Sequence, residues 1–244
     1  MSEFLLSNAK LIDPEAGQVM PGALHIKDGQ IVGVFPQSTD VSAPPSAPAA
    51  TEIDCGGQYL APGIVDIGVK VCEPGERHKE SFGSAGAAAA AGGVTTIVTR
   101  PDTLPAIDNP EALEFVIRRA REAALVRVHP MAALTKGRAG REMTEIGFLQ
   151  DAGAVAFSDC DQVVQDTKVL VRALSYARSL GVLVMAHVQE PILSAGAVAT
   201  SGKFASLQGL PAVSPMAERM GLDRDIALVE MTGVSTSTKP LSSR

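Results

Sequence analysis

The sequence lacks the residues on which several common protein classes depend. It contains no tryptophan and only 3 cysteines in 244 residues. Cys55, Cys72 and Cys160 are odd in number, irregularly spaced, and part of no CxxC or CxxH pair. This pattern argues against a disulfide scaffold and against a zinc module of the usual ligand spacing.

Long apolar runs and basic clusters are also missing. No stretch reaches the roughly 18 apolar residues of a membrane-spanning helix, and the N-terminus lacks the basic-then-apolar pattern of a secretion signal. The formal net charge is −6 and the charges are scattered along the chain, which does not favour nucleic-acid binding. We therefore expect a soluble cytoplasmic protein that binds neither nucleic acid nor a membrane.

The hydrophobic fraction of 45% and the length suffice for one sizeable domain plus an appendage. From residue 61 onward, short apolar segments alternate with helical patterns. Buried strands are expected at residues 64–71, 94–99, 126–131, 153–158 and 182–187. Helices are expected at residues 79–91, 110–124, 143–150, 167–180, near 214, and at 225–232. Continuously apolar strands alternating with helices are typical of a parallel sheet that helices cover.

The first 60 residues have a different pattern. Short antiparallel strands are expected at residues 4–6, 10–12, 23–26 and 30–35, with a further strand at 51–60. Asp28-Gly29 has the positive-φ preference of a tight hairpin turn. The Pro-, Ser- and Ala-rich residues 36–51 indicate a flexible loop.

Residues 61–75 read Ala-Pro-Gly-Ile-Val-Asp-Ile-Gly-Val-Lys-Val-Cys-Glu-Pro-Gly. This stretch resembles a signature of the amidohydrolase superfamily in its dihydroorotase branch, where the first barrel strand ends in His-x-His, followed by Arg and then Glu-Pro-Gly. The retained scaffold residues are Pro62, Gly63, Asp66, Glu73, Pro74 and Gly75. The resemblance extends over about residues 5–233 and includes Leu134-Thr135-Lys136-Gly137.

The resemblance implies an α/β fold: an incomplete (β/α) TIM-type barrel with an N-terminal antiparallel β-sandwich portion. We expect the sandwich portion at residues 1–60, the first five barrel strands within 61–233, and an irregular tail at 234–244. Family members continue through further strands, so we expect truncation or a shifted reading frame near residue 234. Such a fragment exposes apolar edges and should aggregate or need a partner.

The same resemblance places the catalytic metals at positions that have changed here. Amidohydrolases use one or two divalent metals to activate water and polarise the scissile carbonyl. The two metal-binding histidines correspond to Gly68 and Lys70, and the carboxylate ligand to Cys160. His187 is the single family ligand that survives. The later histidine and the catalytic aspartate would fall beyond residue 233, so we assign no catalytic residue.

The substrate positions have changed too. The family arginine that binds the substrate carboxylate corresponds to Cys72, and its asparagine partner corresponds to Asp102. An aspartate would repel that carboxylate. We therefore expect no tightly bound cofactor, with the family's zinc weak or absent.

Two alternatives remain open at these positions. The first is a rebuilt zinc site whose ligands would be Cys72, Cys160, His187 and either Asp159 or Asp161. The other interpretation, which we favour, is that these residues bind no metal and only fill space at the strand ends, with His187 hydrogen-bonded to a neighbour. The second concerns Lys70, which is either a desolvated nucleophile or, as we favour, an ion-pair partner of Asp102 or Glu73.

These observations predict a pseudoenzyme: a dihydroorotase-like protein of pyrimidine biosynthesis with a degenerate metal site. By resemblance, its role would be that of an assembly partner of aspartate transcarbamoylase, and self-association is the other candidate. The alternative is an active metal-dependent dihydroorotase or another cyclic amidohydrolase.

Overall fold

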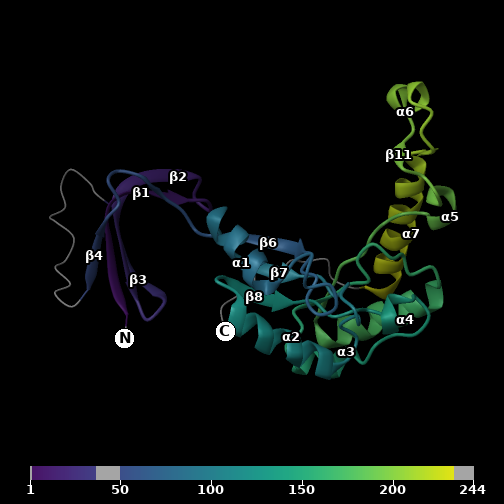
Figure 1. The fold of residues 1–244 in the computed structure, drawn as a ribbon, viewed down its shortest axis with the longest axis horizontal. Helices are drawn as coiled ribbons and strands as arrows, with labels where there is room; N and C mark the ends of the chain where they lie inside the picture. The colour runs from purple at the N-terminus through teal and green to yellow at the C-terminus, as the bar shows by residue number, and fades with distance from the viewer. Residues whose placement is uncertain (1, 37–49, 234–244) are drawn as a thin grey trace. The chain divides into compact units, whose positions relative to one another are not determined.

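The computed structural model describes residues 2–36 and 50–233. The chain divides into two compact units, residues 1–63 and 64–244, of which only these described residues are discussed (Figure 1). The loop expected at 36–51 falls almost wholly outside the described residues, and the tail expected at 234–244 falls entirely outside them. Within the described ranges, no helix is both long and apolar enough to cross a membrane.

The N-terminal unit is one five-stranded sheet in the order β3-β2-β1-β4, with β5 also paired to β1. Its strands are β1 (Glu3–Asp13), β2 (Gln18–Lys27), β3 (Gln30–Pro36), β4 (Thr51–Asp54) and β5 (Tyr59–Leu60). The two strands expected at 4–6 and 10–12 are a single strand. A bulge at Asn8, whose φ is 52°, shifts the register within β1 and leaves the strand continuous.

The expectation of a wholly antiparallel N-terminal unit is wrong. The β1–β2 and β2–β3 pairs are antiparallel, and positive φ at Asp28 and Gly29 forms the predicted hairpin turn. However, β4 and β5 both pair in parallel with β1. The segment expected as one strand at 51–60 is divided by a turn in which Gly56 and Gly57 have positive φ.

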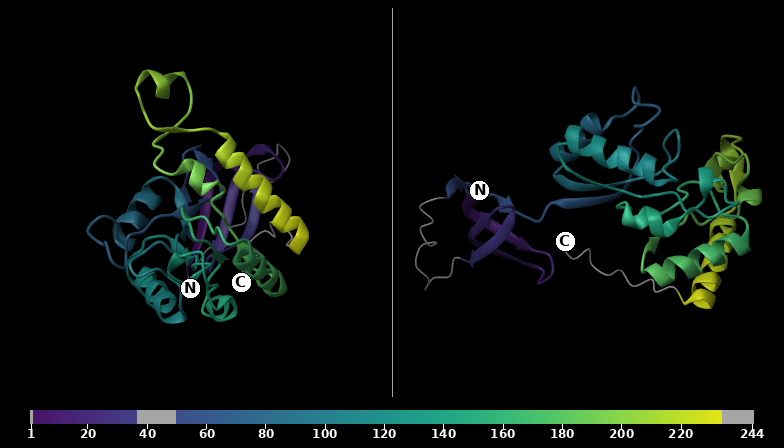
Figure 2. Two further views of the ribbon diagram at one scale, coloured as in Figure 1. Left: turned by 90° about the vertical axis from the view of Figure 1, so that its right-hand side faces the viewer. Right: turned by 90° about the horizontal axis from the view of Figure 1, so that it is seen from below.

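The second unit is built on parallel strands: β6 (Ile64–Val69), β7 (Val94–Thr99), β8 (Arg127–Pro130), β9 (Ala156–Phe157) and β10 (Leu183–Val184). The pairs β6–β7, β7–β8 and β9–β10 are all parallel. A parallel bridge between Ala132 and Phe157 connects the two groups of strands. These pairs confirm the predicted parallel arrangement of the five segments. Strands β6, β7 and β8 lie side by side in Figure 1, and Figure 2 shows the chain from two further sides.

Helices alternate with these strands, as predicted. They are α1 (Phe82–Ala91), α2 (Pro110–Ala123), the 3-10 turn η1 (Lys136–Arg138), α3 (Ile146–Asp151) and α4 (Thr167–Leu180). Helix α1 begins three residues later than expected because Ser81 caps it through a capping box with Ser84. Helix α4 buries Leu170, Leu174 and Ala177, and Gly181 ends it in the left-handed conformation.

The segment after β10 differs from the prediction. It contains α5 (Pro191–Ser194), β11 (Ala199–Thr200), α6 (Lys203–Leu207) and β12 (Ala212–Val213), and the parallel β11–β12 pair was not expected. The two helices expected near 214 and at 225–232 are one helix, α7 (Met216–Thr232). Gly221 lies inside α7 at a close approach: a Cβ there would lie 2.4 Å from the Gln189 backbone nitrogen. The glycine therefore reflects packing rather than a helix end.

Strand β6 is not the buried strand that its sequence predicts. Ile64, Val65 and Ile67 are 56%, 48% and 53% exposed. Among the described strands β6 pairs only with β7, so its other edge and much of both faces lie open. By contrast, β7 lies between two neighbours, and its Ile97 and Val98 are 1% and 4% exposed.

Candidate functional site

The predicted site residues follow the carboxyl ends of the parallel strands. Lys70 comes directly after β6, Arg100 after β7, and Asp159 shortly after β9. In parallel α/β sheets these ends meet at one edge, where ligands usually bind. The sequence therefore brings the family positions to the expected place.

Asp102 is the centre of an ion-pair network at this edge. Its side chain is 3% exposed, and its Oδ2 lies 3.0 Å from Lys70 Nζ and 2.8 Å from Arg100 Nη2. Arg100 Nε also donates to Asp102 Oδ1 at 3.2 Å. Burial alone would raise the pKa of Asp102, but the hydrogen bond from Lys70 and the charge of Arg100 outweigh it and hold the pKa below its usual range. Lys70 is therefore an ion-pair partner of Asp102, as we favoured, and the same contact raises the pKa of Lys70.

The network continues to the loop after β9. Arg138 forms an ion pair with Asp161 and donates from Nε to the Asp159 carbonyl oxygen at 3.2 Å. Arg100 Nη2 lies 3.8 Å from Asp161 Oδ1. Three cationic side chains and two carboxylates thus link the loops that follow β6, β7, β8 and β9.

Gly68 occupies the first of the family's metal-ligand positions, and its backbone has a conformation that residues other than glycine rarely adopt. Its φ is 95°, and no heavy atom would lie within 4 Å of an added Cβ. There is space for a side chain, but residues with a Cβ rarely adopt this conformation. The position therefore lacks a donor and is also shaped for glycine.

Cys72 is 9% exposed, at the position where the family has its substrate-binding arginine. The next residue, Glu73, is also buried. Glu73 accepts from Arg119 Nε at 2.7 Å and from the Phe82 backbone N–H at 3.1 Å, at the start of α1. Burial would raise the pKa of Glu73, but the bonds from Arg119 and Phe82 lower it overall. The carboxylate thus supports α1 and α2 rather than facing a ligand.

Asp159 and Cys160 are unsuited to metal binding for different reasons. Asp159 is 3% exposed and accepts from the Leu134 and Thr135 backbone N–H groups, each at 3.0 Å, and from the Thr135 hydroxyl. Burial nonetheless raises its pKa. Burial and the nearby Asp102 charge also raise the pKa of the Cys160 thiol, which disfavours the thiolate that a metal requires.

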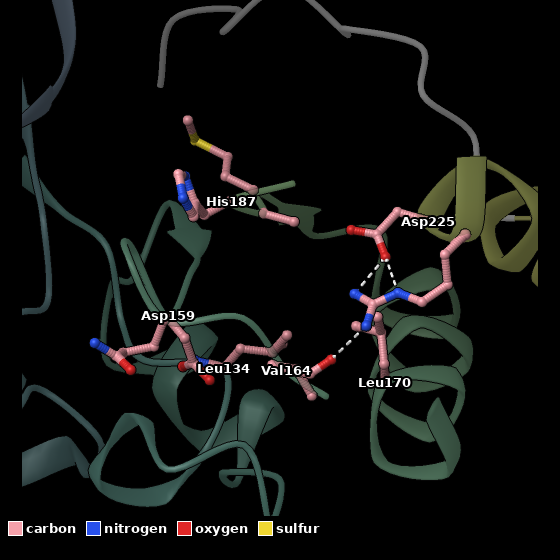
Figure 3. Close-up of a pocket in the computed structure, with 10 residues that line it drawn as sticks. Leu134, Asp159, Val164, Leu170, His187 and Asp225 are labelled. Atoms are coloured by element: carbon pink, nitrogen blue, oxygen red, sulfur yellow. Dashed lines mark hydrogen bonds and ion pairs between the residues drawn. The ribbon is translucent and has the colours of Figure 1, made fainter. Parts of the chain in front are cut away.

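His187 borders a pocket between the strand ends and α7 (Figure 3). Its Nε2 lies 3.1 Å from Gln189 Oε1, a neighbouring hydrogen-bond partner of the kind expected. Asp225 of α7 also lines the pocket, together with Leu134, Asp159, Val164 and Leu170. Arg224 joins Asp225 to the Val164 carbonyl, through bonds of 2.8 Å and 3.1 Å. Asp225 Oδ2 is buried and finds no hydrogen-bond partner among the described residues.

The donors at this edge do not fit the family's zinc. Across residues 2–36 and 50–233, no three His, Cys, Asp or Glu side chains converge as a metal site. The proposed rebuilt set of Cys72, Cys160 and His187 with Asp159 or Asp161 is therefore not brought together. Zinc sites in proteins need three or four nitrogen, sulfur or oxygen ligands. No catalytic step through a metal follows from these residues.

Sequence reasoning missed the three arginines that organise the site. Arg100 directly precedes Pro101-Asp102, and its place immediately after a predicted strand was an available signal. Arg138 lies one residue after Leu134-Thr135-Lys136-Gly137, within the region of resemblance. Arg119 gave no comparable signal, because its contact with Glu73 joins residues 46 positions apart.

Comparisons with known proteins agree on one family. A family model described as dihydro-orotase-like matches residues 57–242. A dihydroorotase-like protein from Pseudomonas putida is 37% identical over 235 residues, covering 96% of this chain and 54% of that protein. A dihydroorotase from Syntrophus aciditrophicus is 35% identical over 242 residues, covering 99% and 55%.

Solved structures give the same architecture. The L-hydantoinase (dihydropyrimidinase) from Arthrobacter aurescens matches with a TM-score of 0.74 at 20% identity, covering 96% of this chain and 51% of that one. At that identity the match shows a shared mixed α/β fold and nothing finer. The chain spans about half the length of the curated relatives and solved structures it matches.

Proposed function

Because this chain belongs to the dihydroorotase-like family of the amidohydrolase superfamily, we propose that it is a dihydroorotase-like protein of pyrimidine biosynthesis that does not catalyse the reaction. Its role is structural, as an assembly partner of aspartate transcarbamoylase. The observation that carries the proposal is the ion-paired Asp102, which occupies a substrate position of the family and is bound by Lys70 at a metal-ligand position.

The contact between Lys70 and Asp102 supports the loss of the family's chemistry at a metal-ligand position and at a substrate position. The ammonium group of Lys70 lies where an imidazole would bind metal, and a cation there repels a divalent ion. The carboxylate of Asp102 lies where an amide would hold an anionic substrate group, and it repels that group. Arg100 adds a second cation on the same Oδ2 that Lys70 contacts.

The position of Gly68 supports the same proposal from the backbone. Regaining a histidine there would need a side chain at a φ of 95°, a region that costs roughly 1–3 kcal/mol for residues other than glycine. The change from the family pattern therefore involves the conformation of the β6 end as well as a side chain.

The finer architecture is part of the proposal. We interpret β6 to β10 as the first five strands of a (β/α) barrel, with the N-terminal sheet as the portion that precedes it. Their parallel pairing and carboxyl-edge site support this interpretation. Zinc binding would be weak or absent, and the cytoplasm would be the compartment.

The alternative function is an active dihydroorotase or another cyclic amidohydrolase. It is supported by the name of the S. aciditrophicus relative, a dihydroorotase with 35% identity, and by His187, which matches the family histidine. It would require metal ligands beyond the described residues.

Metal content and turnover together distinguish the two functions. The purified chain is loaded with zinc, dialysed, and measured for metal by mass spectrometry and for dihydroorotate hydrolysis. We expect well below one zinc per chain and no hydrolysis above the uncatalysed rate. About one zinc per chain with measurable turnover would establish the active enzyme and remove the proposed function.

The assembly role is tested separately. We expect the chain to co-elute in size-exclusion chromatography with aspartate transcarbamoylase from P. putida, the source of a 37% identical relative. Separate elution at all concentrations would contradict this role, and a larger species of this chain alone would favour self-association.

A further inference from the structure

Arg100 and Arg138 approach the same carboxylate oxygen from two different loops. Arg138 Nη2 forms an ion pair with Asp161 Oδ1, and Arg100 Nη2 lies 3.8 Å from the same oxygen. Arg100 directly follows β7, Arg138 is the last residue of η1, and Asp161 belongs to the loop after β9. Two guanidinium groups from separate segments therefore face one small oxyanion at the carboxyl edge of the strands.

Both guanidinium groups are held in place by contacts other than Asp161. Arg100 binds both oxygens of the buried Asp102, from Nε to Oδ1 at 3.2 Å and from Nη2 to Oδ2 at 2.8 Å. Arg138 donates from Nε to the Asp159 carbonyl oxygen at 3.2 Å, and its side chain is 16% exposed. Side chains that are already held in one position lose little conformational entropy when a ligand binds to them.

Asp161 is much less constrained than the arginines. Its side chain is 60% exposed, and within the described part of the chain its carboxylate forms ion pairs only with Arg100 and Arg138. Ion pairs of such exposed carboxylates contribute little to stability. The Asp161 carboxylate can therefore move into water at small cost, whereas the two guanidinium groups stay where they are.

The charges at this edge favour a ligand with two negative charges. Lys70, Arg100 and Arg138 are three cations, and Asp102 is shared by Lys70 and Arg100. The Asp159 carboxylate is bound by backbone and hydroxyl donors and pairs with none of these cations among the described residues. Guanidinium groups bind phosphate and carboxylate oxygens through paired N–H donors. A doubly charged oxyanion therefore matches both the charge and the donors.

The backbone of the two loops is unusual as well. Arg138 has a φ of 58°, and Cys160, directly before Asp161, has a φ of 57°. Residues other than glycine adopt this region at an energetic cost, and such residues cluster at sites that hold ligands. The conformation of both loops is thus consistent with a shaped site.

We propose that Arg100 and Arg138 form a binding site for a small doubly charged oxyanion, which takes the place of the Asp161 carboxylate between them. In the unliganded chain Asp161 occupies the site and competes with the ligand. Neither arginine lies at a position where the resemblance places a metal ligand or a substrate group. The inference depends neither on catalysis nor on an assembly partner.

The test is titration of the purified chain with inorganic phosphate and, separately, with malonate. Binding is measured by isothermal titration calorimetry at pH 8, where both anions are mainly doubly charged, with the ionic strength held constant by sodium chloride. We expect saturable binding of one anion per chain. The tighter of the two anions distinguishes a phosphoryl group from a dicarboxylate as the preferred ligand.

Substitutions at the site and at a distant ion pair provide the comparison. Arg138→Gln should weaken binding by about tenfold or more, because a charge-assisted pair of donors is lost. Arg138→Lys keeps the charge without the planar fork and should recover only part of the loss. Asp161→Asn should instead tighten binding by about threefold or more, because the competing carboxylate is removed. Arg219→Gln and Asp223→Asn are the matched controls, from an exposed pair on α7, and should leave the affinity unchanged.

Several results would overturn the proposal. Absence of saturable binding in both the unaltered chain and Asp161→Asn would do so, as would unchanged binding in Arg138→Gln. Full recovery in Arg138→Lys would indicate attraction to charge alone, and unchanged or weaker binding in Asp161→Asn would contradict the competition. Thermal unfolding identifies any variant that fails to fold. Asp161→Asn remains decisive in that case, because misfolding does not produce a gain of affinity.

Discussion

Replacing Asp102 by asparagine tests whether the ion-pair network around Asp102 stabilises the folded chain. Asparagine is the residue that the family has at this position, and its side chain is nearly isosteric with aspartate. The substitution therefore removes the charge while preserving volume. Lys70 and Arg100 would lose the carboxylate that lies 3.0 Å and 2.8 Å from their nitrogen atoms.

The expected loss of stability follows from burial on each side of the pair. Breaking a fully buried ion pair costs about 3–5 kcal/mol. The Asp102 side chain is 3% exposed, but Lys70 and Arg100 are 51% and 28% exposed, so water can solvate the cations that remain. We therefore expect a decrease of about 1–3 kcal/mol in the free energy of unfolding at pH 7.

The direction of the pKa shift determines how the stability contribution of Asp102 changes with pH. Because the pKa of Asp102 is lowered in the folded chain, its contribution is fully present above the unfolded pKa of about 3.9. It is lost as the pH falls through the lower folded value. The difference between the unaltered chain and Asp102→Asn should therefore be large at pH 7 and shrink as the pH falls below about 4. Taking the difference cancels the titration of the other groups.

The assay is urea unfolding followed by circular dichroism at pH 7 and in the acid range. Asp161→Asn is the control, because that side chain is 60% exposed and its loss should cost about 0–1 kcal/mol. Equal stability of Asp102→Asn and the unaltered chain at pH 7 would refute the reasoning. So would a loss of the same size at every pH, because that result would indicate altered packing rather than a lost charge.

Three further predictions concern the site and its support. His187→Ala should leave zinc retention in equilibrium dialysis unchanged, because one imidazole makes no zinc site; about one zinc per chain that the substitution removes would contradict this. Glu73→Gln should lower the free energy of unfolding by about 1–3 kcal/mol. The Gln amide keeps one acceptor oxygen, so either Arg119 or the Phe82 N–H loses its buried acceptor, and Arg119 also loses its ion-pair partner. The exposed-pair variant Glu76→Gln is the control, and an equal effect of both would argue against the role of Glu73. A combined variant that restores the family residues should retain more zinc but hydrolyse no dihydroorotate. The reason is that no general base is restored, and the absence of a general base by itself lowers the rate by about 10²–10⁴-fold. Robust turnover would show that our account of the site is wrong. The combined substitutions are Gly68→His, Lys70→His, Cys72→Arg, Asp102→Asn and Cys160→Asp.

The structure adds a stability cost to that combined variant. Histidine at residue 68 would need the φ of 95° that glycine adopts there, and arginine at residue 72 would place a cation at a site that is 9% exposed. We therefore expect the fivefold variant to unfold at a lower urea concentration than Asp102→Asn alone. Reversing Gly68→His within it should recover part of the difference.

The sequence alone was sufficient for local and periodic features. Alternating apolar segments predicted the parallel strands, and the capping residues Asn109 and Gly181 predicted ends of α2 and α4. These features depend on neighbours within a few residues, so the order of side chains encodes them directly. The changed family positions at Gly68, Lys70 and Asp102 were also visible. An ion pair of Lys70 with Asp102 or Glu73 was expected, and the structure shows that the partner is Asp102.

Only the tertiary structure decided features that depend on distant neighbours. The sequence of β6 predicts a buried strand, but burial requires partners on both sides, and the described chain supplies one. The parallel pairing of β4 with β1 joins residues about 50 positions apart, beyond the reach of any local pattern. Arg100 and Arg138 likewise both reach Asp161 because the loops after separate strands converge at one edge. The composition of a segment determines what it can form, whereas its surroundings determine whether that surface is covered and which charges it meets.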